Sequence, residues 1–152
     1  MSSAIKLSSA LFWYLFAILF IAAAPYAGFL DGVLFPPVDR SKTSITIVDE
    51  SEGRTVFEGV FFRNRSCLYK GVEFFRESGV LMDAKRIGPV VEAVLGWNEF
   101  GPWATSADAQ EVLCGMKAKA EYACYGDNPF HTYVTFYDGS ENTDPICKRN
   151  SQ

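Results

Sequence analysis

The feature that most constrains this chain is an uncharged run from Leu7 to Leu30, close to the N-terminus. Its centre, Ala10–Ala24, reads ALFWYLFAILFIAAA and is dominated by large apolar and aromatic side chains. About 20 helical residues, each rising about 1.5 Å, cross a hydrocarbon core of about 30 Å. Because backbone polar groups in lipid must hydrogen-bond within their own segment, the run predicts a transmembrane helix over residues 7–30.

A cleaved secretory signal peptide is the alternative interpretation of the same run. Lys6 supplies a short positive region, and Ala22-Ala23-Ala24 supplies a site with small residues for a signal peptidase. Pro25 would then follow the cut, where proline fits peptidase sites poorly, and the apolar stretch continues as far as Leu30. These features favour an anchor that stays attached.

The charges that flank the run predict its orientation. The α-amino group and Lys6 precede it, and Asp31 is the first charge after it. Basic residues next to a span favour the cytoplasmic side. We therefore expect residues 1–6 in the cytoplasm and residues 31–152 in the periplasm or outside the cell.

The exported part has the length of one domain and an acidic balance. All 18 acidic residues follow the run, together with all but one of the 14 basic residues. An acidic domain without a basic cluster argues against nucleic acid and anionic lipid head groups as partners. Phosphate-binding glycine loops and metal-binding carboxylate loops are absent from the sequence, so no cofactor is expected.

Four cysteines, an even number, all follow the run: Cys67, Cys114, Cys124 and Cys147. In an exported domain this count predicts two disulfides. A zinc site is disfavoured because the sequence has no C-x-x-C pair and His131 is its single histidine.

The exported part reads as a stalk, a β domain and a tail. Pro36-Pro37 predicts an extended stalk over residues 31–42 that forms neither helix nor sheet. The β domain is expected over residues 43–138, and a polar tail over residues 139–152 is tethered by Cys147. Strands are predicted over Thr43–Val48, Thr55–Phe62, Cys67–Phe75, Val80–Ile87, Met116–Cys124 and Phe130–Tyr137. Val90–Leu95 fits either a strand or a short helix, and Thr105–Leu113 predicts one or two helical turns with Thr105 as N-cap.

The clearest strand is Met116–Cys124, in which apolar residues alternate with Lys117, Lys119 and Glu121. This alternation is typical of a half-buried antiparallel strand. The five residues Tyr125–Pro129 then close a hairpin with Phe130–Tyr137. Short strands at this spacing predict a mainly β fold, an antiparallel β-sandwich with one short helix.

Tyr122-Ala123-Cys124 resembles the Tyr-x-Cys of the penultimate strand in the immunoglobulin fold, and Cys67 precedes it at a compatible spacing. The resemblance implies an Ig-like sandwich. It does not extend to the core tryptophan of that family, because Gly79-Val80-Leu81 occupies the corresponding stretch.

The hairpin predicts the disulfide pairing. If it is centred on Asp127, Cys114 lies opposite about residue 140, and a short return of the tail brings Cys147 beside it. Cys67 and Cys124 remain, and their pairing matches the inter-sheet bridge that the immunoglobulin resemblance implies. The competing set, Cys114–Cys124 with Cys67–Cys147, requires a bent strand, because ten extended residues span about 33 Å.

The candidate binding residues are Trp97, Phe100 and Trp103, which fall in a predicted loop that contains Gly101-Pro102. Aromatic side chains on a loop are typical of protein-binding hot spots and of sugar-stacking surfaces. Alternatively, the three rings fill one end of the sandwich.

Catalytic signals are weak, so an enzyme is not expected. The alternative is a cell-envelope hydrolase with a carboxylate pair drawn from Glu58, Glu73 and Asp83. Glu58 and Cys67 resemble the first two positions of a motif in bacteriophage-type muralytic enzymes, but Glu73 stands where that motif has threonine.

In layout, and in the stretch Arg65-Ser66-Cys67…Glu73-Phe74-Phe75, the chain resembles small uncharacterized single-span membrane proteins of tailed bacteriophages and bacteria. The expected function is that of a membrane-anchored binding domain with a protein partner in the envelope. It would be an accessory subunit of an envelope complex or a phage-encoded envelope protein. The sequence leaves the oligomeric state open.

Overall fold

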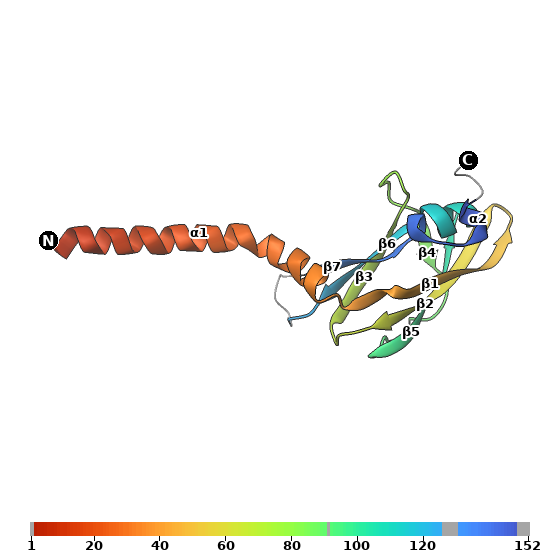
Figure 1. Ribbon diagram of the computed structural model, residues 1–152, viewed down its shortest axis with the longest axis horizontal. Helices are drawn as coiled ribbons and strands as arrows, with labels where there is room; N and C mark the ends of the chain where they lie inside the picture. The colour runs from red at the N-terminus through yellow and green to blue at the C-terminus, as the bar shows by residue number, and fades with distance from the viewer. Residues whose placement is uncertain (1, 91, 126–130, 149–152) are drawn as a thin grey trace.

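A long N-terminal helix, α1 (Ser2–Leu34), projects away from a β domain that the rest of the chain forms (Figure 1). The computed structural model describes residues 2–90, 92–125 and 131–148. The strands are β1 (Val38–Ser51), β2 (Arg54–Arg63), β3 (Leu68–Phe75), β4 (Ala84–Arg86), β5 (Gly96–Thr105), β6 (Lys117–Ala123) and β7 (Thr132–Asp138).

The helix α1 contains the predicted helical run and extends beyond it at both ends. Its large apolar side chains from Leu11 to Ile21 are exposed along the isolated rod. Among the residues that the structure describes, no helix combines the length and the apolarity that crossing a membrane requires.

The predicted stalk over residues 31–42 is wrong. Residues 31–34 continue α1, and β1 begins at Val38, so only residues 35–37 connect the helix to the sheet. Gly32 lies close to β7 in this part of the helix, since a Cβ there would lie 2.7 Å from the carbonyl oxygen of Tyr133. Glycine therefore lets the last turns of α1 lie directly against β7, and Pro36-Pro37 then excludes further helix.

The fold is mainly β, as predicted, with two antiparallel sheets. One sheet has the strand order β1-β2-β5-β4, and the other has the order β3-β6-β7. Aromatic contacts join them: Phe57 meets Phe74 at 5.4 Å between ring centroids, and Phe61 meets Phe136 at 6.3 Å. The core therefore lies between the sheets, in a sandwich-like arrangement.

The alternation predicted for Met116–Cys124 is confirmed. Met116, Ala118, Ala120 and Tyr122 are buried, whereas Lys119 is exposed. The hairpin pairs Lys119 with Thr135, a register symmetrical about position 127 as predicted. The predicted loop residues 126–129 and Phe130 lie outside the described residues.

Two local predictions need correction. The segment Val80–Ile87 forms only the three-residue strand β4, preceded by an isolated bridge between Leu81 and Phe75. Thr105 ends β5 instead of capping a helix, and the irregular helix η1 (Glu111–Gly115) begins later. Asp108 supplies the side-chain acceptor there, because its Oδ1 accepts from the Glu111 N–H at 2.7 Å.

Both disulfides have the predicted pairing, Cys67–Cys124 and Cys114–Cys147. Cys67–Cys124 is not an inter-sheet bridge, however. It joins the ends of β3 and β6, which are neighbours in one sheet, since Leu68 is paired with Ala123. The tail begins with η2 (Gly139–Glu141) and α2 (Pro145–Lys148), which Cys147 holds against η1, and residues 149–152 lie outside the described residues.

Candidate functional site

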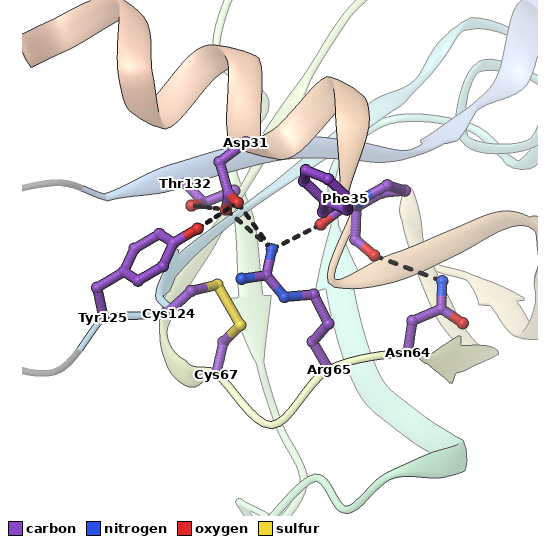
Figure 2. A network of polar contacts seen from close by, with 9 residues as sticks. Asp31, Phe35, Asn64, Arg65, Cys67, Cys124, Tyr125 and Thr132 are labelled. Carbon is purple, nitrogen blue, oxygen red and sulfur yellow. Dashed lines mark hydrogen bonds and ion pairs between the residues drawn. A yellow bond between two sulfur atoms is a disulfide. The ribbon is translucent and has the colours of Figure 1, made fainter.

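The first notable site is the junction between α1 and the β domain, built around Asp31 (Figure 2). Asp31 is buried, and its carboxylate accepts hydrogen bonds from Tyr125 Oη at 2.7 Å and Thr132 Oγ1 at 2.9 Å. Arg65 Nη1 donates to both carboxylate oxygens, at 3.0 and 2.9 Å. A single side chain of α1 is thus held by three separate segments of the β domain.

The electrostatics of Asp31 favour its charged form. Burial alone would raise the pKa of this carboxyl group. The hydrogen bonds from Tyr125 and Thr132, together with the hydrogen bond and charge of Arg65, outweigh burial and lower the pKa below its ordinary value of 3.8. Asp31 is therefore an ionised structural group at neutral pH.

Arg65 also binds the backbone at the end of α1. Its Nη1 donates to the carbonyl oxygen of Phe35 at 2.8 Å. Cys67, two residues after Arg65 in the same turn, forms the disulfide with Cys124 (Figure 2). The turn that carries Arg65 is therefore covalently tied to the end of β6. This arrangement fixes the direction in which α1 leaves the domain.

The predicted binding loop is wrong, because Trp97, Phe100 and Trp103 belong to β5. Gly101-Pro102 does not interrupt this strand. It is a cis peptide, and Gly101 has a φ of 105°, a conformation that favours glycine. The strand stays paired with β2 across this point through a register shift between Phe57 and Gly59.

The three aromatic residues are not brought together on one surface. Trp97 is 60% exposed and stacks edge-on against Phe62. Phe100 contacts Phe136 of the other sheet at 5.4 Å, and Trp103 contacts Phe74 at 5.0 Å. Phe100 and Trp103 therefore fill the interior, and Trp97 alone remains available to a partner.

The second site is a pocket of about 310 Å³ between the two sheets. Residues of β2, β4 and β5 line one side of it, and residues of β3, β6 and β7 line the other. Its aromatic lining consists of Phe61, Tyr69, Phe100, Trp103, Tyr122 and Phe136. A cavity of this size and composition has the character of a ligand site.

Two arginines contribute to the lining, and each contacts a different part of the wall. Arg63 is buried, and its guanidinium donates to the carbonyl oxygens of Arg65, Cys67 and Ala93. Arg86 lies with its Cζ 5.8 Å from the centre of the Trp103 ring, and its Nη2 donates to the Pro89 carbonyl at 2.7 Å. The pocket lining therefore carries two arginines beside two carboxylates, those of Glu92 and Glu99.

Arg86 and Trp103 line the pocket, and one nitrogen of each, Arg86 Nε and Trp103 Nε1, is buried without a hydrogen-bond partner among the described residues. Buried N–H donors are nearly always satisfied in folded proteins.

Tyr69 and Tyr122 are neutral neighbours here. Burial raises the pKa of Tyr69, and the nearby Arg86 cation opposes that rise in part. Burial likewise raises the pKa of Tyr122.

The carboxylates considered for hydrolysis are not paired. Glu58 and Glu73 are exposed on β2 and β3, which belong to different sheets, and Asp83 is exposed just before β4. Within the described part of the chain, no cluster of His, Cys, Asp and Glu is suited to holding a metal ion. His131 instead contacts Glu121 of the neighbouring strand.

Sequence analysis missed both the Asp31 junction and the inter-sheet pocket. In the sequence, Asp31 is recognisable only as the first charge after the apolar run. Its neighbour Gly32, which packs closely on Tyr133 of β7, is the one local signal of a helix–strand contact. Arg86 and Trp103 are separated in sequence and become neighbours through the pairing of β4 with β5. The chain matches no protein-family model, no curated protein and no solved structure.

Proposed function

We propose that this chain is a membrane-anchored, non-enzymatic binding protein whose β domain faces the periplasm or the outside of the cell. In this proposal α1 lies in the bilayer through residues 7–30, with the N-terminus in the cytoplasm. The β domain engages a protein partner in the envelope, either as an accessory subunit of an envelope complex or as a phage-encoded envelope protein.

The observation that carries the proposal is the uncharged run of α1, whose large side chains are exposed from Leu11 to Ile21. An exposed apolar surface of this extent is typical of a segment that contacts lipid or protein. The two disulfides support an oxidising compartment for the β domain. The Asp31 junction supports an anchor whose direction relative to the domain is fixed.

We further propose that the β domain is Ig-like. The strand orders β1-β2-β5-β4 and β3-β6-β7 correspond to the orders ABED and CFG of constant-type immunoglobulin domains. In this correspondence Tyr122-Ala123-Cys124 lies at the end of the F strand, whereas the immunoglobulin fold has its Tyr-x-Cys near the start of that strand. The chain departs from the family in its disulfide, which joins the C and F strands.

The contact surface in this proposal is the exposed apolar group before and within β5: Val94, Leu95 and Trp97. Trp97 supplies a large ring, which contacts Phe62 edge-on. Rings of this kind often anchor protein interfaces. Phe100 and Trp103 support this surface from inside and do not touch the partner.

Paired topology reporters at the C-terminus test the proposal. A reporter that is active only outside the cytoplasm should be active when fused after Gln152, and a reporter that requires the cytoplasm should be inactive. Adding lysine or arginine between Asp31 and Arg40 should weaken this bias, because orientation depends on basic residues close to the span. The opposite reporter pattern would refute the proposed location.

A further inference from the structure

The exposed apolar surface of α1 continues beyond the uncharged run, to the last turn of the helix and the residue after it. Val33, Leu34 and Phe35 are each at least 60% exposed, whereas Asp31 is buried. Asp31 is the first charge after the run, and a hydrated charge there would mark the point at which the helix enters water. Because Asp31 is instead turned into the β domain and paired with Arg65, the outer side of the helix end presents large apolar side chains (Figure 2).

Part of the backbone at the end of α1 is hydrogen-bonded by the β domain. Carbonyl groups at the end of a helix lack partners within the helix, and in a soluble protein water often supplies them. Here Arg65 Nη1 donates to the Phe35 carbonyl oxygen at 2.8 Å, and Asn64 Nδ2 donates to the Pro36 carbonyl oxygen at 3.4 Å (Figure 2). These two carbonyl groups therefore suit a poorly hydrated layer, where backbone polar groups must find partners within the protein.

Two exposed tyrosine rings flank the same end of α1. The Tyr125 hydroxyl donates to Asp31, and a Cβ on Gly32 would lie 2.7 Å from the Tyr133 carbonyl oxygen. Each of the two tyrosines is 57% exposed, and Tyr133 Oη donates to Glu121 Oε1 at 3.0 Å. Tyrosine is enriched where a membrane meets water, because its ring has an apolar body and a polar tip. The residues beside the helix end are therefore of the type that the head-group layer of a bilayer favours.

The length of this segment matches the thickness of the head-group layer. The Phe35 N–H still donates to the Asp31 carbonyl oxygen at 2.8 Å, so helical spacing extends to Phe35. Five residues of helix beyond Leu30 cover about 7 Å. The polar layer on each side of the hydrocarbon core is about 5–7 Å thick. If the hydrocarbon core ends at Leu30, as in the proposed function, residues 31–35 fall within the head-group layer.

We propose that residues 31–35 and the adjoining base of the β domain (Arg65, Tyr125 and Tyr133) lie in the lipid head-group layer, with the ring of Phe35 among the head groups. This inference rests on the proposed function, because it takes α1 to lie in the bilayer. It deepens that function by placing the β domain directly on the membrane surface. The buried ion pair of the junction makes this placement possible, since it removes the first charge after the run from the lipid-facing side of the helix.

The test is fluorine NMR of the full chain, labelled with 5-fluorotryptophan, in phosphatidylcholine nanodiscs. The lipid carries a nitroxide either on the choline head group or at the end of an acyl chain. Phe35→Trp places a reporter at the proposed depth. Val48→Trp is the matched control at an exposed position of β1, which runs away from α1 (Figure 1). The native Trp13 reports whether α1 lies in the bilayer.

We expect the head-group nitroxide to broaden the signal of the Phe35→Trp reporter about tenfold or more strongly than that of the Val48→Trp reporter. Paramagnetic broadening falls with the sixth power of distance, and the ten residues from Val38 to Val48 extend about 30 Å. The acyl-chain nitroxide should broaden Trp13. Leu34→Trp, at another exposed position, is the second reporter for the case in which Phe35→Trp does not fold.

Equally weak broadening at positions 35 and 48 by the head-group nitroxide would overturn the proposal. A second copy of the chain that covers residues 33–35 would give this result, because it would hold the lipid away from them. If Trp13 is nevertheless broadened by the acyl-chain nitroxide, the anchor stands and only the placement of the β domain on the membrane fails. If Trp13 is not broadened, the proposed anchor itself fails, and the placement falls with it.

Discussion

Arg65 Nη1 lies 2.9 Å from Asp31 Oδ2, and this ion pair joins the end of α1 to the turn before β3. The same carboxylate accepts from Thr132 at the start of β7, and Gly32 brings the helix backbone onto that strand. The helix is therefore attached to the β domain by specific contacts with the turn before β3 and with β7, as well as by the chain itself.

We expect Asp31→Asn to loosen this junction. The amide cannot form the ion pair, and lost hydrogen bonds to a buried charged group cost about 2 kcal/mol. Amide hydrogen exchange should become faster in residues 31–35 and at the start of β7. Asp39→Asn is the control, because the Asp39 carboxylate contacts its close neighbours Ser41 and Lys42. Equal exchange in both variants and the parent would contradict the role of Asp31.

The pH dependence of the free energy of unfolding should follow the carboxyl groups of Asp31 and Asp138. Burial would raise the pKa of Asp138, but hydrogen bonds from Ser140 and Lys117 lower it below 3.8, and the pKa of Asp31 is lowered as well. A carboxyl group with a lowered folded-state pKa stabilises the fold above its unfolded value. That contribution is lost as the pH falls through the lowered pKa.

We therefore expect the free energy of unfolding to be steady above about pH 5 and to fall below pH 3.8. Denaturant unfolding at a series of pH values measures this directly. The Asp31→Asn protein should show a shallower decline in acid than the parent. An identical decline would mean that the charge on Asp31 does not contribute to stability.

The sequence predicted those parts of the fold whose signal is local. Lysines that alternate with small apolar residues predicted β6, because a strand places successive side chains on opposite faces. The hairpin register then predicted that Cys114 lies opposite about residue 140. The structure places the contact one residue earlier, since a Cβ on Gly139 would lie 2.7 Å from the Cys114 carbonyl carbon. The Cys114–Cys147 pairing follows from that register.

The errors arose where tertiary contacts override local signals. Gly101 and Pro102 are usual strand breakers, but here Gly101 accommodates close packing on Glu58 of β2, and β5 continues. Residues 31–34 follow the apolar run and precede two prolines, but they are helical, and the end of α1 packs on β7. The sequence does not predict the pocket, because lining residues such as Arg86 and Trp103 become neighbours only through the pairing of β4 and β5.

The two disulfides should differ modestly in their contribution to stability. Cys67–Cys124 closes a separation of 57 residues, and Cys114–Cys147 closes one of 33 residues. Restriction of the unfolded chain predicts about 4 kcal/mol for the longer loop and about half a kcal/mol less for the shorter one. We expect the double alanine variant of Cys67 and Cys124 to melt at the lower temperature. Calorimetry of the two double variants checks the order, and the reverse order would contradict it.

Alanine variants of the two β5 tryptophans should have different effects on stability and on partner binding. Trp103→Ala removes a ring packed on Phe74 and should cost about 3–5 kcal/mol of stability. Trp97→Ala, at an exposed ring, should cost about 1 kcal/mol or less but weaken capture of the envelope partner. Thermal melts and crosslinked pull-downs measure the two effects. A folded Trp97→Ala protein with undiminished capture would remove Trp97 from the contact surface.

The central claim, an uncleaved anchor joined to an oxidised β domain, is tested most directly by the intact mass of the protein recovered from carbonate-washed membranes. The account predicts a mass that includes residues 1–24 and is lighter by four hydrogens than the fully reduced chain, because both disulfides are formed. A soluble protein that begins near Pro25, or a membrane-bound protein whose four cysteines are reduced, would contradict it.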